Sequence, residues 1–197
     1  DTIYHEHFSY LSLHTVNRIF SSEGLRVWHV EKLATHGGSL RIYGCHENDK
    51  RKNNKSVIKL LNEESNAGLQ KLETYLNFKD QVNKIKNDLI SFLIQQKNKG
   101  NKVIAYGAAA KGNTLLNYAG VKPDLIGFVC DAAQAKQGKF MPGSHIPILH
   151  PSEMLNRQID YILILPWNIA TEIVKQNAAL KTKGVRFVIA VPELSIL

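Results

Sequence analysis

The carboxyl-terminal half of the sequence predicts an α/β fold with a parallel sheet, because short apolar runs alternate there with helical segments. Four runs have the length and composition of buried strands: 102–106, 126–130, 161–165 and 186–191. Such alternation is typical of a parallel sheet with helices on both faces. The sequence therefore predicts a Rossmann-like domain over residues 101–197.

The segments between these runs predict helices and one long loop. A turn rich in Gly and Ala leads from the first run into a helix that ends near Gly120. Residues 132–151 contain Gly and Pro and predict a loop. Ser152 is placed to cap a short helix, and Asn168 is placed to cap and begin another.

The first 46 residues predict a helix followed by a β-hairpin. Residues 11–20 have helical spacing of apolar side chains, and Gly24 ends that helix. Residues 25–33 and 39–45 alternate like strands around a Gly-Gly turn. A helix and one hairpin are too small for a good core, so we interpret this region as the end of a larger α/β domain.

The middle of the chain predicts a linker and amphipathic helices. Residues 47–55 are polar and are interpreted as a linker, and Ser56 is a candidate cap for a short helix. Between Leu69 and Leu93, apolar residues recur at gaps of three and four, which indicates one stripe on a long helix that Gly100 ends. We expect this helix to pack on the following domain.

Composition narrows the class of protein. The formal charge is +8, with 44% apolar and 21% charged residues, and these globular values argue against disorder. No apolar run approaches the roughly 18 residues of a membrane span, so no membrane partner is expected. Two cysteines make no disulfide framework and favour a cytoplasmic location. No nucleic-acid-binding module is present in the sequence. We interpret the basic residues as a solvated linker and helix face, although a small anionic substrate fits the charge equally well.

The turn Tyr106-Gly-Ala-Ala-Ala-Lys-Gly-Asn-Thr114 lies where such folds bind anions. Gly107 and Gly112 have the spacing of a P-loop, but Asn113 stands where a P-loop has Lys. The backbone N–H groups of this turn and the charge of Lys111 suit a phosphate. The small residues equally suit tight packing between a strand and a helix, and both interpretations stay open.

Polar and aromatic residues follow the second and third predicted strands. Asp131 lies 24 residues after Gly107, near the ~20-residue offset at which a Rossmann acid holds a ribose hydroxyl. A polar strand end explains Asp131 equally well. Trp167 is placed to stack on a base or a sugar beside Asn168, and we expect the loop 138–147 on the same rim.

The opening decapeptide, 1–10, contains two histidines, a glutamate and two tyrosines. Metal ligation would use His5, Glu6 and His7, but no Cys cluster or helical His–Glu spacing supports it, and no metal is expected in this chain. Proton transfer is a second interpretation, because imidazole titrates near neutral pH. A hydrogen-bonded polar loop is the simplest explanation of the local sequence.

Five ordered blocks resemble the carboxyl-terminal part of a sugar C-methyltransferase. This three-domain family methylates a carbon of nucleotide-linked keto-deoxysugars with S-adenosylmethionine. The blocks are Asp1-Thr-Ile-Tyr-His-Glu-His-Phe-Ser-Tyr10, Gly37-Gly-Ser-Leu-Arg41, Tyr106-Gly-Ala-Ala-Ala-Lys-Gly-Asn-Thr-Leu-Leu-Asn117, Lys136-Gln-Gly-Lys-Phe-Met-Pro-Gly-Ser-His-Ile-Pro147 and Ile164-Leu-Pro-Trp-Asn168.

The resemblance implies a domain order of a small zinc-binding domain, a methyltransferase domain that holds the donor, and a Rossmann-like carboxyl-terminal domain. Residues 1–46 resemble the remnant of the methyltransferase domain, 47–100 the linker helices, and 101–197 the Rossmann-like domain. Asp1 looks like a cut inside a longer protein. We therefore expect S-adenosylmethionine to be bound mainly upstream, zinc to be bound in the missing amino-terminal domain, and no cofactor in this fragment.

The resemblance also implies a mechanism. A base removes the proton next to the sugar ketone, and the enolate attacks the donor methyl group. The family pattern Tyr-x-Glu-His falls on Tyr4, Glu6 and His7, with His7 as the base and the other two near the sugar oxygens. The carboxyl-terminal domain would help to cradle the nucleotide diphosphate of the substrate. From the expected geometry we infer a substrate-binding set of Gly107, Lys111, Gly112, Asn113, Trp167 and Asn168.

An alternative of a different class stays open, namely a stand-alone Rossmann-type module that binds a dinucleotide or coenzyme A. The turn around Lys111 and the position of Asp131 support it, whereas the Tyr-x-Glu-His block argues against it. In the methyltransferase interpretation, the fragment alone is expected to be inactive. Its residues 1–46 are then expected to expose apolar surface and to favour self-association.

Overall fold

Residues 8–35 and 38–197 are described by the computed structural model, and the chain divides into two units within helix α3 (Leu72–Asn98). The described residues from Phe8 to Lys79 form the hairpin unit, and Asp80–Leu197 form the sheet unit. Within the described ranges, no helix has the length and apolar character to cross a membrane. The predicted linker region 47–100 is thus shared between the two units.

The hairpin unit confirms the predicted helix and hairpin. Its elements are α1 (Leu13–Ser22), β1 (Leu25–Leu33), β2 (Ser39–His46), α2 (Lys55–Asn66) and the start of α3. The two strands pair antiparallel, with a bulge between Val27 and His29. Apolar side chains from both helices and one face of the hairpin form a small core: Leu13, Val27, Val30, Val57 and Leu60.

The start of α1 is capped from two sides. Ser12 accepts a hydrogen bond from the backbone N–H of Thr15 at 3.2 Å. Glu64 of α2 accepts hydrogen bonds from the N–H groups of Leu13 at 2.6 Å and His14 at 2.8 Å. Because a helix begins with unpaired N–H groups, a carboxylate at this position satisfies two of them and complements the helix dipole.

The predicted cap of α2 is wrong by two residues. Asn54, not Ser56, is the N-cap, and its side chain accepts from the N–H of Ser56 at 2.9 Å. The hydroxyl of Ser56 instead accepts from the N–H of Val30 at 3.2 Å and contacts His29 Nδ1 at 3.0 Å. Ser56 therefore ties α2 to the hairpin, a tertiary role that local sequence does not show.

The sheet unit has the strand order β5-β4-β3-β6-β7-β8. Its further elements are β3 (Val103–Tyr106), α4 (Ala110–Tyr118), β4 (Val129–Cys130), β5 (Ile148–Leu149), α5 (Glu153–Asn156), β6 (Tyr161–Ile164), α6 (Ala170–Gln176), α7 (Ala178–Thr182), β7 (Arg186–Ile189) and β8 (Ser195–Ile196). All pairs are parallel except β7 with β8. Along the chain, β4 and β5 are added on one side of β3, and β6, β7 and β8 are then added on its other side. The strand order therefore reverses between β3 and β6. The fold is α/β and Rossmann-like, as predicted.

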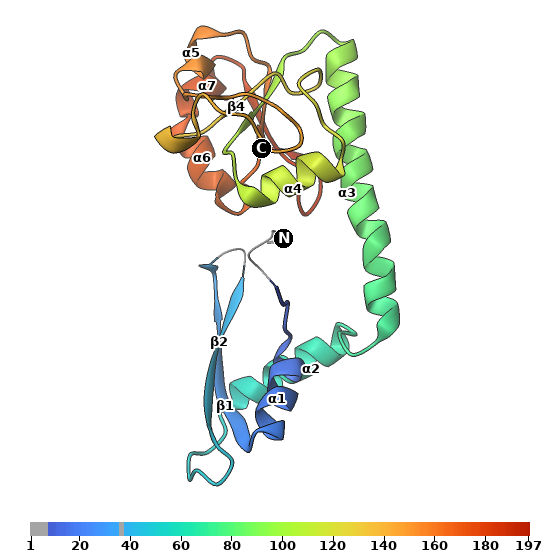
Figure 1. The fold of residues 1–197 in the computed structure, drawn as a ribbon, viewed down its shortest axis with the longest axis vertical. Coiled ribbons are helices and arrows are strands. Elements are labelled where there is room, and N and C mark those ends of the chain that lie inside the picture. Colours follow the sequence, from blue (N-terminus) through green and yellow to red (C-terminus); the bar gives the residue numbers. More distant parts are fainter. Residues whose placement is uncertain (1–7, 36–37) are drawn as a thin grey trace. The chain divides into compact units, whose positions relative to one another are not determined.

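Helices cover both faces of this sheet (Figure 1). Along β3, Val103 and Ala105 belong to a core that includes Leu93 of α3 and Leu116 of α4. Ile104 belongs to a second core, with side chains from α5, α6 and α7. This alternation follows from the period of two along a strand and fixes which helix lies on which face.

Three features differ from the sequence-based expectation. β4 is only two residues long, and β5 and β8 lie in segments without a strand pattern. The loop 138–147 is not on the rim expected for it. Asn117 near the end of α4 donates to the carbonyl of Pro142 at 2.9 Å, and Lys122 donates to that of Gly143 at 2.7 Å. Since α4 runs from the carboxyl edge of the sheet towards its amino edge, these contacts hold the loop near the amino edge.

Candidate functional site

The reversal of strand order places the turns after β3 and β6 next to each other, which is where open α/β sheets bind ligands. We call residues 107–113 together with Pro166–Asn168 the carboxyl-end site. Gly107 has a φ of 85°, and its N–H donates to the carbonyl of Cys130 at 2.7 Å. The site is thus built on backbone hydrogen bonds at the ends of two neighbouring strands.

The two glycines of the site are explained by close packing. A Cβ atom on Gly107 would lie 2.6 Å from Cδ of Pro166, and one on Gly112 would lie 2.5 Å from Cβ of Leu165. Both distances are far below van der Waals contact. The P-loop-like spacing therefore reflects how tightly the turn and the start of α4 pack on the end of β6, whatever the turn binds.

Lys111 and Trp167 come together in the structure. The ammonium nitrogen of Lys111 lies 4.5 Å from the centroid of the Trp167 ring, a cation–π distance. Partial burial lowers the pKa of Lys111, because water no longer fully solvates the charge. A positive charge held over an aromatic face can pair with an anion beside a flat ring.

The amino terminus of α4 is another source of positive potential. Its N-cap is Ala109, whose side chain provides no hydrogen bond to the first N–H groups of the helix. Asn113 lies one turn further on. Its side-chain oxygen is buried and has no hydrogen-bond partner among the described residues. These groups are chemically suited to a phosphate or another oxyanion.

Asn168 does not cap the following helix, contrary to the prediction. It is exposed and lies in a 3₁₀ turn, Trp167–Ile169, and α6 begins after Ile169. The chain enters α6 through this turn, where the N–H of Ile169 donates to the carbonyl of Pro166 at 3.0 Å. A tight turn of this kind pairs backbone groups without a capping side chain.

Asp131 is not available to hold a ribose. The residue is 8% exposed, and its carboxylate accepts from the N–H of Ala108 at 2.7 Å and from that of Ala133 at 2.8 Å. Lys136 also donates to it at 3.0 Å. Burial, together with the charge of Asp131, raises the pKa of Tyr106. Because both carboxylate oxygens already accept hydrogen bonds, the acid that supported the dinucleotide interpretation is engaged within the protein.

The predicted catalytic residues Tyr4, Glu6 and His7 lie outside the described residues. The chain that follows them lines a cavity of about 850 Å³ in the hairpin unit. Ser9 and Tyr10 share its wall with Gly38–Leu40, and Glu64 also lines it. Two blocks of the family resemblance, far apart in sequence, therefore meet at one cavity.

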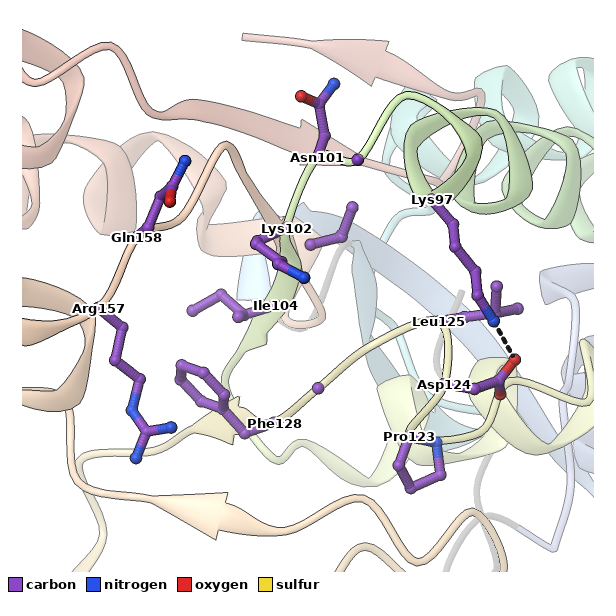
Figure 2. A pocket seen from close by; sticks show the side chains of 13 residues that line it. Lys97, Asn101, Lys102, Ile104, Pro123, Asp124, Leu125, Phe128, Arg157 and Gln158 are labelled. Carbon is purple, nitrogen blue, oxygen red and sulfur yellow. Dashed lines mark hydrogen bonds and ion pairs between the residues drawn. The ribbon is translucent and has the colours of Figure 1, made fainter.

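A second cavity, of about 610 Å³, lies at the amino ends of β3 and β4 (Figure 2). Its basic side chains are largely paired. Lys97 bonds to Asp124 at 2.9 Å, and Arg157 bonds to Glu153 at 2.8 Å. Because two of its three basic side chains are paired and it lies opposite to the usual ligand edge, this cavity is the weaker candidate.

The described residues hold no metal cluster, and the thiol of Cys130 is not activated. No group of three or more His, Cys, Asp or Glu side chains that could hold a metal ion occurs in residues 8–35 and 38–197. Burial raises the pKa of Cys130 to about 12, which keeps the thiol protonated and unreactive at neutral pH.

Two polar residues with long-range hydrogen bonds were missed by the sequence analysis, namely the buried Glu64 and the half-exposed Lys136. Glu64 sits on an otherwise ordinary helix surface, and Lys136 lies in a predicted loop. A buried Glu on a helix gives no periodic signal, and the contact of Lys136 with Ala108 spans 28 residues. The only available signal was that Lys136 opens one of the blocks of the family resemblance.

Comparison with known proteins defines the class. A family described as the C-methyltransferase C-terminal domain matches residues 34–192. The chain belongs to this family. The C-methyltransferase NovU of Streptomyces niveus is 35% identical over 197 residues, which is 100% of this chain and 47% of the relative. The chain therefore spans about half the length of the curated relative that it matches.

The three resemblance blocks of the sheet unit meet around α4. Gly107 contacts Pro166, Asn117 bonds to the carbonyl of Pro142, and Lys136 bonds to that of Ala108. The blocks are therefore parts of one packed assembly around the carboxyl-end site and the helix that follows it.

Proposed function

We propose that this chain is part of a sugar C-methyltransferase. Its substrate would be a nucleotide-linked keto-deoxysugar, deprotonated at the carbon next to the ketone and methylated there from S-adenosylmethionine. The observation that carries the proposal is the family match over 34–192 together with a C-methyltransferase relative that aligns with the whole chain. The Tyr4-x-Glu6-His7 pattern supports the sugar substrate class.

The chemistry assigned to the amino-terminal segment is proton removal. A ketone acidifies the adjacent C–H, and the imidazole of His7 takes that proton as the C–H electron pair moves into the enolate. Glu6 and Tyr4 bind or polarise the sugar oxygens. Imidazole suits this step because its ordinary pKa lies near neutral pH. We assign the sugar to the cavity walled by Ser9, Tyr10 and Gly38–Leu40, since Ser9 and Tyr10 follow this segment in sequence.

The sheet unit does not fit the methyl donor. An adenosine moiety bound in the Rossmann manner needs a free acid at the end of the second strand, and Asp131 is buried and engaged by Ala108 and Lys136. S-adenosylmethionine, when bound, supplies the methyl group. We place its binding outside this unit and assign no step to it here.

The carboxyl-end site is assigned to the nucleotide part of the substrate. The uncapped N–H groups of α4 and the ammonium of Lys111 would meet the diphosphate. The ring of Trp167, 4.5 Å from that ammonium, would stack on the base or the sugar. Asn113 and Asn168 complete the proposed set, whereas Gly107 and Gly112 act by allowing the close approach of the turn to β6.

The alternative, a stand-alone dinucleotide-binding module, loses its main support. It relied on Asp131 as a free acceptor for a ribose hydroxyl, and that carboxylate already accepts three hydrogen bonds.

The test is the variant His7→Asn in the full-length methyltransferase that contains this sequence. We expect kcat to fall about 10²–10⁴-fold, the usual contribution of general acid–base catalysis, with substrate binding nearly unchanged. Exchange of the substrate α-hydrogen with deuterated water, followed by NMR without the methyl donor, should stop. This exchange isolates proton removal from methyl transfer.

His5→Asn is the matched control, because it removes the other imidazole of the segment. It should exchange the hydrogen at the parent rate. If His7→Asn still exchanges at that rate, His7 is not the base. A full-length enzyme that exchanges no hydrogen from any keto-deoxysugar nucleotide would refute the proposed reaction.

A further inference from the structure

We propose that Lys136 is a positioning residue that locks the turn between β3 and α4, so that the carboxyl-end site keeps the shape needed for an anionic ligand. The ligand part of this inference rests on the proposed function of the site. The lock itself rests on the contacts of Lys136 and Asp131.

Lys136 makes two hydrogen bonds that close the turn. Its ammonium donates to the carbonyl of Ala108 at 3.0 Å and to the carboxylate of Asp131 at 3.0 Å. The same carboxylate oxygen accepts from the N–H of Ala108 at 2.7 Å. Both polar groups of Ala108 are therefore held by one ion pair, which joins this residue to the segment after β4.

The turn supplies no polar side chain of its own to fix Ala108, although Gly107 is held by the carbonyl of Cys130. Residues 108–110 are three alanines, which offer no polar side chain, and Gly107 has a φ of 85°. The segment on the other side of the ion pair is itself fixed, because Gln137 donates to the carbonyl of Asp131 at 2.9 Å. The N–H and the carbonyl of Ala108 are therefore held by side chains from outside the turn.

The conformation of Ala108 decides where α4 starts. The next residue, Ala109, is the N-cap of α4, and Lys111 lies in the first helical turn. A change at Ala108 would move the uncapped N–H groups and the ammonium of Lys111 together. Preorganised donors bind an anion more tightly than donors that must be ordered on binding.

Removal of the Lys136 ammonium leaves two acceptors without their cation. Asp131 then faces Ala108 with an uncompensated charge, and the carbonyl of Ala108 is left to water. Since Asp131 is buried, this loss disturbs the turn more than the loss of a surface ion pair would.

The test compares Lys136→Met with Lys139→Met in the full chain. Lys139 lies three residues further along the chain, is exposed, and its ammonium makes no hydrogen bond or ion pair among the residues that the structure describes. Two quantities are measured for each variant: the hydrogen-exchange rate of the Ala108 amide by NMR, and the Kd for thymidine diphosphate by calorimetry. Thymidine diphosphate serves as the probe for a nucleoside diphosphate.

For Lys136→Met we expect the Ala108 amide to exchange at least about tenfold faster, and the Kd to rise about 5–20-fold. Lys139→Met should leave both within about twofold, because an exposed lysine contributes little. Lys136→Arg keeps a cation with several donors and should restore part of both quantities. If Lys136→Met does not fold, both quantities can still be measured in Lys136→Arg.

The possible outcomes distinguish two claims, namely that Lys136 locks the turn and that this lock supports ligand binding. An unchanged Ala108 exchange rate would overturn the lock, whatever happens to the ligand. Faster exchange with an unchanged Kd would overturn the positioning role while the proposed function stands. If the unmutated chain does not bind thymidine diphosphate, the proposed function of the site fails, and the positioning role fails with it. This failure to bind would be seen in the unmutated chain, so it can be distinguished from a defect caused by the substitution.

Discussion

Lys111 is the residue whose charge has the largest proposed part in binding. We predict that Lys111→Met raises the Kd for thymidine diphosphate about tenfold, the usual value of a charge-assisted hydrogen bond. Binding by the parent should weaken with rising salt, because the contact is electrostatic. Lys99→Met, an exposed lysine at the end of α3, is the control and should have no effect on the Kd.

The lowered pKa of Lys111 gives this contact a pH dependence. The charged form is lost on raising the pH through a value below the ordinary 10.5, so affinity should start to fall earlier than for an exposed lysine. The contribution of Lys111 to folding stability changes with pH in the opposite direction to the affinity. Between the folded and the unfolded pKa the unfolded chain binds more protons, so the Lys111 contribution to stability rises with pH. A Kd with the same dependence on pH in the parent and in Lys111→Met would contradict a role of Lys111 in binding.

At the scale of elements, the cap of α1 by Glu64 is the contact that joins the two helices of the hairpin unit. We predict that Glu64→Gln lowers the free energy of unfolding of this unit by about 1–2 kcal/mol. The amide can accept one hydrogen bond, but its NH₂ group would face the second backbone donor. Urea denaturation measures the free energy of unfolding. Hydrogen exchange of the α1 amides shows whether the loss lies in this helix.

Glu63→Gln is the matched control on the same helix. Glu63 pairs with Lys32 at the surface, and such pairs contribute little to stability. Its loss should change the free energy of unfolding by less than about 0.5 kcal/mol. Equal effects of the two substitutions would show that the two hydrogen bonds of Glu64 are not what stabilises α1.

The long elements could be predicted from sequence because their patterns are local. The hairpin strands, α3, and the strands β3 and β6 are each marked by a run of apolar residues at one period. β5 and β8 could not be predicted, because two-residue strands exist only through their neighbours. The cap at Asn54 was missed since both it and Ser56 are good capping residues, and only tertiary contacts of Ser56 distinguish them.

The location of the candidate site could be predicted from the sequence, but the contacts of its side chains could not. The turn after β3 and the residues after β6 follow from the alternation of strands and helices. The engagement of Asp131 did not follow, because it depends on Lys136 and Ala108, which the loop brings together in space. The glycines illustrate the same limit, since their neighbours, Pro166 and Leu165, are more than 50 residues away in sequence.

At the scale of the whole molecule, the hairpin unit exposes apolar side chains. Phe8 is 95% exposed, Ile58 62%, Leu11 51% and Ile19 48%. The two-stranded sheet also leaves a strand edge without a partner in the described residues. We predict that the isolated chain self-associates, because burial of such surface is favourable. Sedimentation equilibrium over a range of concentrations measures it.

Substitutions on the two units give the control. Ile58→Glu on α2 should shift the equilibrium towards monomer. Ile94→Glu, which changes an exposed isoleucine of the sheet unit, should not. A chain that stays monomeric at high concentration would contradict the predicted self-association. Equal effects of Ile58→Glu and Ile94→Glu would show that the self-association does not use the apolar surface of the hairpin unit.

The two tryptophans of the chain fall one in each unit. Trp28 lies on β1, with the guanidinium of Arg51 5.8 Å from its ring centroid, and Trp167 lies in the carboxyl-end site under Lys111. Indole emission depends on nearby charge, so the two rings report on different surroundings. In a Trp28→Phe chain, all remaining tryptophan fluorescence comes from the carboxyl-end site. The molecule therefore carries its own optical reporter at the place where a nucleotide is expected to bind, and titrations there need no added label.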